Sequence, residues 1–101
     1  MRSTIDNRLA SMRARVPSHI VYRGFPHETV VLNLETGLYH GLNAVAGDML
    51  TALERSDSVG AAAARLAEDY SQPLERVTAD LAALCEGLAE RGLIQLEPAS
   101  A

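Results

Sequence analysis

The sequence contains no lysine and no tryptophan, and only one phenylalanine and one cysteine among its 101 residues. A lone cysteine cannot form an internal disulfide, which is typical of a protein in the reducing cytoplasm. No apolar run approaches the ~20 residues of a membrane span, and the N-terminus lacks the apolar segment of a signal peptide. The apolar fraction of 48% is typical of a globular protein. The sequence therefore predicts one small cytoplasmic domain, with a core mostly of leucine, valine and alanine.

Acidic residues outnumber basic ones, and the net charge is −4. The first fifteen residues contain four arginines and one aspartate, whereas the rest contains five arginines and twelve acidic residues, a net charge of −7. A body with this charge repels phosphate backbones, so we expect no nucleic-acid partner. We predict that residues 1–17 form a basic N-terminal arm, either poorly ordered or a marginal helix through Ile5, Leu9 and Met12.

The stretch from residue 30 to residue 43 predicts a β-hairpin that leads directly into a helix. Valine, leucine, threonine and tyrosine favour strands, and a glycine in the turn supplies the positive φ that a tight connection needs. A two-residue turn would place Leu34 opposite Tyr39, and a three-residue turn would place it opposite Leu38. The sequence leaves both registers open, and with them whether Tyr39 or His40 points toward the core.

Apolar periodicity predicts three strands followed by three helices. The expected strands are Ser18–Arg23, Glu28–Leu34 and Leu38–Leu42. The expected helices are Ala44–Glu54, Val59–Tyr70 and Pro73–Arg91. We expect side-chain caps from Asn43 and from the break before Val59, and Gly92 is a suitable left-handed end for the last helix. Leu93–Leu96 is a candidate for a short final extended segment.

This order predicts an α+β fold that is winged helix-turn-helix-like, with a three-stranded antiparallel sheet followed by three helices. The hairpin is unusual in preceding the helices. We assign residues 18–96 to the folded domain, residues 1–17 to the arm and residues 97–101 to a tail.

Motifs that carry chemistry are missing from the sequence. It contains no phosphate-binding loop, dinucleotide-binding fingerprint or nucleophile elbow. His19, His27, His40 and Cys85 lack the spacing of a metal site. Cys85 lies on the apolar stripe of the last helix, which predicts a buried, unreactive thiol. The acidic residues fall on outer faces without forming an acid–base pair, so we expect no catalytic residue, no metal and no cofactor.

The third predicted strand has no obvious partner on its far side. An unpaired strand is a template for another extended chain, and Gly41 lets a second backbone approach closely. The pattern therefore indicates peptide binding by strand addition, with coverage by Leu93–Leu96 or by a second copy of the chain as alternatives. Gly87, inside the last helix, costs ~1 kcal/mol relative to alanine, which indicates close packing against a bound chain or against the protein's own strands.

Four segments together resemble the PqqD-like family, the small recognition domains of peptide-modifying pathways. These segments are Leu32–Asn43, Leu66–Tyr70, Val77–Leu81 and Leu88–Ile94. The most specific parts are the Gly-x-Tyr-x-x-Leu-Asn motif and the Glu-Arg-Gly-Leu-Ile ending. The likeness covers residues 18–96, and it implies a three-stranded antiparallel sheet, three helices and no catalytic activity.

The resemblance also implies that the domain binds the leader segment of a ribosomally made precursor peptide, as an added strand in a groove beside the last helix. It assigns backbone pairing to Leu38, Tyr39, His40, Gly41 and Leu42. It assigns the groove wall to Val77, Asp80, Leu81, Leu84 and Leu88. The sequence is most similar to the stand-alone recognition elements of lasso peptide pathways. There the domain hands the precursor to a leader-cleaving cysteine protease, and a cyclase then closes the ring.

Other functions remain as alternatives. A PQQ-pathway-type peptide chaperone would work with a radical enzyme instead. A winged-helix DNA-binding protein would need a basic recognition helix, whereas Val59–Tyr70 contains only Arg65 against Glu68 and Asp69. A dimerising structural subunit would use the open strand edge for self-association.

Under the leader-binding interpretation, the charge of the last helix indicates the kind of leader. Because this helix carries acidic residues outward, an apolar and aromatic leader fits better than a strongly acidic one.

Overall fold

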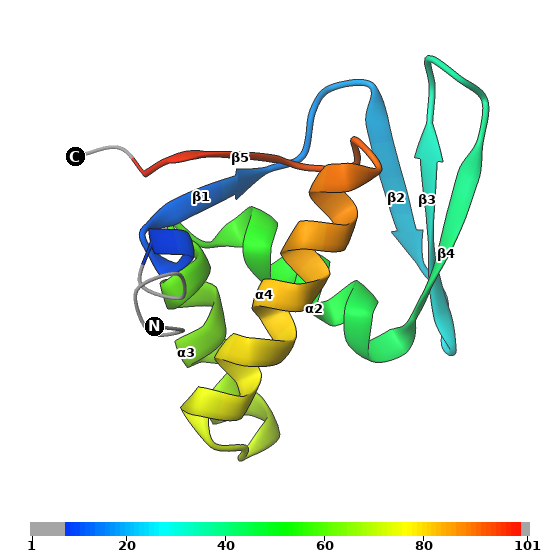
Figure 1. Ribbon diagram of the computed structural model, residues 1–101. Coiled ribbons are helices and arrows are strands. Elements are labelled where there is room, and N and C mark those ends of the chain that lie inside the picture. Colours follow the sequence, from blue (N-terminus) through cyan, green and yellow to red (C-terminus); the bar gives the residue numbers. More distant parts are fainter. Residues whose placement is uncertain (1–7, 100–101) are drawn as a thin grey trace.

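The computed structural model describes residues 8–99, which form two small sheets and three long helices (Figure 1). One sheet has three antiparallel strands in the order β2 (Ile20–Gly24), β3 (Glu28–Asn33) and β4 (Tyr39–Asn43). The helices are α2 (Ala44–Arg55), α3 (Val59–Tyr70) and α4 (Leu74–Glu90). The predicted α+β fold, with three antiparallel strands followed by three helices, is confirmed.

The second sheet corrects the interpretation of the chain ends. Met12, which was expected in a marginal helix, begins the strand β1 (Met12–Arg15), and β1 pairs antiparallel with β5 (Gln95–Pro98). The pair is joined by an ion pair of 3.3 Å between Arg15 Nε and Glu97 Oε1. Of the expected helix, residues 8–10 are helical and Ile5 lies outside the described residues.

The tail expected at residues 97–101 is also wrong at its first two positions, since Glu97 and Pro98 belong to β5. A strand held by a partner some eighty residues away leaves little local pattern, which is why the sequence did not indicate β1. Pairing of β5 with β1 also removes one alternative for the hairpin edge, because the final segment does not pair with β4.

Local signals set the ends of the helices as expected. Asn43 Oδ1 accepts a hydrogen bond from Ala46 N at 2.8 Å and caps α2, and Ser58 Oγ caps α3 by accepting from Ala61 N at 3.0 Å. After α4, Gly92 has a φ of 74°, and Leu93 N donates to Leu88 O at 2.9 Å. Together with the bond from Gly92 N to Ala89 O at 3.0 Å, this bond forms a Schellman motif, which satisfies carbonyl groups that the helix end would leave free.

The β3–β4 hairpin has a register that neither predicted turn gives. Leu32 lies opposite Tyr39, and Asn33 N donates to Leu38 O at 2.9 Å. The connection is therefore a four-residue loop that contains Leu34, so both expected pairings of Leu34 are wrong.

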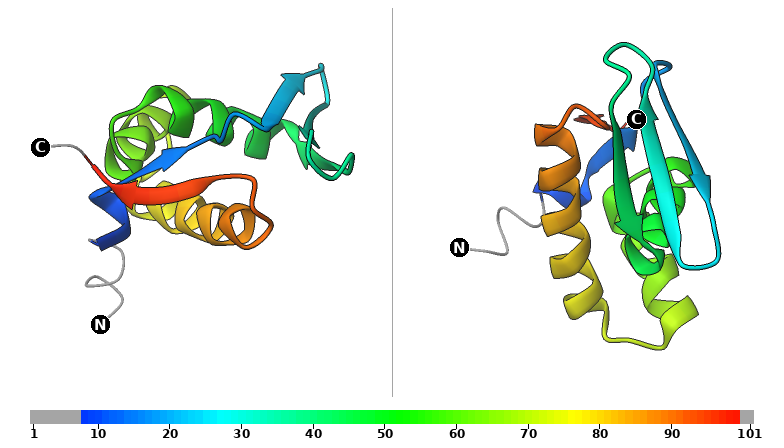
Figure 2. Two further views of the ribbon diagram at one scale, coloured as in Figure 1. Left: turned by 90° about the horizontal axis from the view of Figure 1, so that it is seen from above. Right: turned by 90° about the vertical axis from the view of Figure 1, so that its right-hand side faces the viewer.

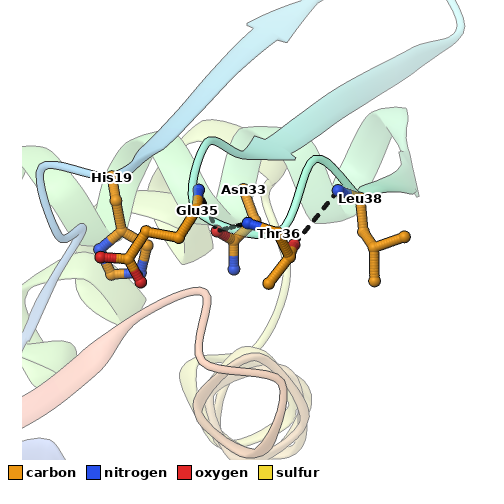
Figure 3. A network of polar contacts seen from close by, with 5 residues as sticks. All are labelled: His19, Asn33, Glu35, Thr36 and Leu38. Carbon is orange, nitrogen blue, oxygen red and sulfur yellow. Dashed lines mark hydrogen bonds and ion pairs between the residues drawn. The ribbon is translucent and has the colours of Figure 1, made fainter.

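The side chain of Asn33 explains this earlier turn. Its Oδ1 accepts from the backbone N–H groups of Glu35 at 2.9 Å and Thr36 at 3.2 Å, and Thr36 Oγ1 accepts from Leu38 N at 3.2 Å (Figure 3). Such local side-chain bonds to the backbone stabilise a turn directly after the asparagine. The strand therefore ends one residue before Leu34, and Gly37 closes the loop with a φ of 76°.

The observed register decides which side of β4 faces the core. His40 lies opposite Val31, and Val31 is completely buried. Because side chains alternate along a strand, His40 points toward the helices, whereas Tyr39 lies on the outer side with 73% of its surface exposed.

Helix α2 packs directly on β3 and β4, whereas α4 packs on α3. The approach of α2 is closest at Gly47, where a Cβ atom would lie 2.0 Å from Thr29 Oγ1 and 2.7 Å from Thr29 Cβ. Gly47 and Thr29 are both buried. A glycine at this helical position is therefore required by the distance between α2 and β3.

We expect Gly47→Ala to lower the free energy of unfolding by about 1–3 kcal/mol, because overpacking a tight contact forces shifts of side chains and backbone. Urea unfolding measures this change. Gly87→Ala is the matched control, since a Cβ there would meet none of the described atoms within 4 Å. The control should gain up to ~1 kcal/mol from helix propensity. A Gly47→Ala variant as stable as the unmodified protein would contradict the close contact.

Candidate functional site

The free edge of the three-stranded sheet belongs to β4. In residues 8–99, β3 is the only strand that pairs with β4. The bond from Asn33 N to Leu38 O makes these two residues a hydrogen-bonded pair, and such pairs alternate with non-bonded pairs along an antiparallel ladder. His40 and Leu42 therefore bond to β3, while the N–H and C=O groups of Tyr39 and Gly41 point away from it and are available to an added strand.

This edge lies on the same side of the molecule as α4. In both views of Figure 2, β4 is the strand nearer to the side that α4 occupies, and β2 lies on the far side of the sheet. Asn43, the last residue of β4, is also the cap of α2. The chain that leaves the edge thus turns at once into the helix behind it.

A pocket of about 340 Å³ lies next to the end of β4, between the three helices. We call this cavity the α4 pocket. It is lined by Val45, Met49, Leu66, Tyr70, Gln72, Arg76, Val77 and Asp80. Apolar side chains from α2 and α3 face two charged ones from α4, an arrangement typical of a site that holds an apolar side chain and fixes the orientation of its backbone.

The predicted backbone residues divide into two groups. Tyr39 and Gly41 face the open edge, and Leu38 is exposed just before the strand. His40 and Leu42 use their backbone groups for the ladder, and the side chain of Leu42 is 7% exposed and lies in the core.

The residues of the predicted groove wall also fall into two groups, those at the surface of the wall and those buried behind it. Val77 and Asp80 line the α4 pocket, and Leu84 is half-buried beside the core. Leu81 and Leu88 are at most 1% exposed, so their side chains support this wall from behind rather than offer surface to a ligand.

Sequence reasoning missed the contributions of α2 and α3 to the pocket. Apolar periodicity predicted the helix over these residues, but Val45 is 51% exposed and lines the pocket together with Met49. Gly47, Leu50 and Leu53 belong to the buried face of α2. The signal that could have separated the two groups is Gly47, because a glycine marks the side of the helix that approaches the sheet most closely.

Gly87 lies on the same face of α4 as Asp80, since seven residues make about two helical turns. Because a Cβ at Gly87 would meet none of the described atoms within 4 Å, the alternative that this glycine packs against the protein's own strands is wrong. The space beside it is open.

The rim of the pocket carries a tyrosine held by a carboxylate. The hydroxyl of Tyr70 donates to Asp48 Oδ2, and this hydrogen bond raises the pKa of Tyr70 to about 12. The hydroxyl remains a hydrogen-bond donor into the alkaline range and links α3 to α2. Cys85 is completely buried, as predicted, and burial raises the pKa of its thiol to about 11, so the reactive thiolate is scarce.

The described part of the chain contains neither a cluster of metal-binding side chains nor a membrane-spanning helix. Within residues 8–99, His, Cys, Asp and Glu side chains form no group of three that could hold a metal ion. No helix in this range has the length and apolar character needed to cross a bilayer.

This chain is similar to known proteins both in sequence and in structure. Residues 28–94 match the family described as coenzyme PQQ synthesis protein D (PqqD). A structure of TbiB1 in complex with the TbiA(beta) leader peptide has a TM-score of 0.72 at 27% identity, covering 80% of this chain and 94% of that chain. Lasso peptide synthetase B1 complexed with the leader peptide has a TM-score of 0.71 at 25% identity, covering 82% of this chain and 98% of the other. No curated protein matches in sequence.

In the free protein, we expect the amide hydrogens of Tyr39 and Gly41 to exchange with solvent at least about tenfold faster than those of His40 and Leu42, because ladder bonds protect the latter pair. NMR-detected hydrogen–deuterium exchange on the isolated chain measures this alternation. Equal protection of all four amides at low protein concentration would show that the edge of β4 is already covered.

Proposed function

Because the chain belongs to the PqqD family, we propose that it is a non-catalytic peptide-binding adaptor. It binds the leader segment of a ribosomally made precursor peptide as a strand added to β4, and it presents that peptide to a processing enzyme. The observation that carries this proposal is the open edge at Tyr39 and Gly41, which lies on the α4 side of the sheet, with the α4 pocket next to the end of β4.

The two structural neighbours support both the ligand and the pathway. Each contains a leader peptide, and one is a lasso peptide synthetase B1. We infer that this chain serves a lasso peptide pathway, in which its enzyme is a leader-cleaving cysteine protease that acts before a cyclase. A PQQ-type chaperone for a radical enzyme remains the second candidate, because the family description names PQQ synthesis.

Charge and burial support the remaining parts of the proposal. The body of the protein is acidic and α3 contains a single arginine, Arg65, which disfavours DNA as the partner. The one cysteine is buried and free, in keeping with work in the cytoplasm. The α4 pocket mixes apolar side chains with Arg76 and Asp80, which favours a leader that combines an apolar or aromatic residue with polar neighbours.

Gly41→Pro tests the strand-addition model. Proline removes the N–H group that points to the open edge, and its ring obstructs an approaching backbone, whereas the bonds from His40 and Leu42 to β3 stay intact. We expect leader affinity to fall at least about tenfold. Fluorescence anisotropy measures it, with the labelled leader of the precursor encoded beside this chain and a scrambled control peptide.

Gly41→Ala is the matched control for this substitution. It keeps the N–H group, and its Cβ would lie at an ordinary contact distance of 3.7 Å from Glu28 Oε1, so leader affinity should change less than about threefold. Strand addition at this edge is excluded if the proline variant keeps the unfolding midpoint and the leader affinity of the unmodified protein.

Gly87→Leu tests the α4 side of the groove. The leucine fits the open space and improves helix propensity by ~0.8 kcal/mol, so the protein should be at least as stable as before. Its side chain occupies the volume that a leader needs between α4 and β4, and we expect leader affinity to drop about tenfold or more. Gly87→Ala, with its small side chain, separates bulk from helix propensity. A stable leucine variant with unchanged affinity would place the leader elsewhere.

A further inference from the structure

The face of the sheet that points away from the helices is strongly apolar. We call it the outer face and define it by Val21, Phe25, Val30, Leu32 and Tyr39. A shallow depression of about 370 Å³ lies over Val21, Phe25, Val30 and Leu32. Val21 is 46% exposed and Phe25 50%. In the described part of the chain, the helix that packs on this sheet is α2, which covers the opposite face.

One cation borders the outer face. The guanidinium of Arg23 lies 5.7 Å from the centroid of the Phe25 ring, a cation–π distance that fixes both side chains relative to each other. Arg23 is exposed and belongs to a body with a net charge of −7. An apolar patch of aromatic and branched residues with an arginine at its rim has the composition of a protein-binding surface.

The outer face is continuous with the edge of β4. Tyr39 belongs to both, since its backbone faces the edge and its side chain lies on the outer face opposite Leu32. An added strand continues the pleat of the sheet, so every second leader side chain points to this same face. A bound leader therefore enlarges the outer face with its own residues, next to Tyr39.

We propose that the outer face, together with the outward side chains of a bound leader, is the docking surface for the enzyme that processes this leader. This inference rests on the proposed function. The occupant is a protein with an apolar contact surface and a carboxylate opposite Arg23. An enzyme placed here contacts adaptor and substrate at once, whereas the groove on the α4 side is filled by the leader.

A composite surface couples the two binding events. The enzyme binds the adaptor more tightly when the leader is in place, and by thermodynamic reciprocity the enzyme tightens the adaptor's hold on the leader by the same factor. We expect this factor to be about five or more. An enzyme docked on a surface remote from β4 would show no such coupling.

The test uses the full chain, the labelled leader of the precursor encoded beside it, and the leader-cleaving protease encoded with them. The variant Val21→Thr/Phe25→Ser removes apolar area from the outer face while threonine keeps strand propensity. Leu74→Ser is the matched control, because Leu74 is a 53% exposed leucine on α4, away from the sheet. Arg23→Glu is a second, independent change at the rim.

Anisotropy gives leader affinity, and sedimentation velocity gives the mass and affinity of the complex with the protease. We expect the double variant to bind leader within about twofold of the unmodified chain, and to lose about tenfold or more in protease affinity together with the coupling. Arg23→Glu should weaken protease binding in a salt-dependent manner, and Leu74→Ser should change neither.

The inference is overturned if the double variant and Arg23→Glu both bind protease as the unmodified chain does, or if the unmodified chain binds leader but not protease. A leader-free dimer that the double variant abolishes would assign the outer face to a second copy and would also overturn it. Failure of the unmodified chain to bind leader at all is a different result, because it contradicts the proposed function itself.

Discussion

The close approach of α2 to β3, made possible by Gly47 against Thr29, is the constraint on which the site depends. Any side chain at residue 47 would push the helix away from the sheet. Because Asn43 both ends β4 and caps α2, the distance between α2 and the sheet also fixes the position of the edge strand β4. At the other end of the helix, the hydroxyl of Tyr22 on β2 donates to Glu54, so sheet and helix are joined across their length.

Features that depend on neighbours in sequence were predictable. Asn43 and the serine before α3 cap helices with their own side chains, and Gly37 and Gly92 take the positive φ that their turns need. Each of these is a short-range bond or a steric property of one residue, so the residue type carries the information. Element order and fold class followed from these signals and from apolar periodicity.

Features that depend on distant partners were not predictable in the same way. The pairing of β1 with β5 joins the two ends of the described chain. The extended segment predicted at Leu93–Leu96 overlaps β5 at Gln95 and Leu96, but its pattern does not identify β1 as its partner. The hairpin register depended on two competing local hydrogen bonds, which the Asn33 side chain accepts from Glu35 N and Thr36 N and which start the turn directly after Asn33. A shift of one residue exchanges the two faces of a strand, so the core side of β4 could not be read before the turn was known.

The same alternation is the physical basis of the two binding sites proposed above. Along β4, backbone groups alternate between β3 and the open edge, and side chains alternate between the core and the outer face. At Tyr39 the backbone faces the open edge and the side chain faces outward, so the proposed leader and the proposed enzyme would both contact this residue without competing for the same atoms. A helix presenting one apolar stripe could not keep two ligands separate over so short a segment, which gives a physical reason for placing the hairpin, rather than α4 alone, at the centre of recognition.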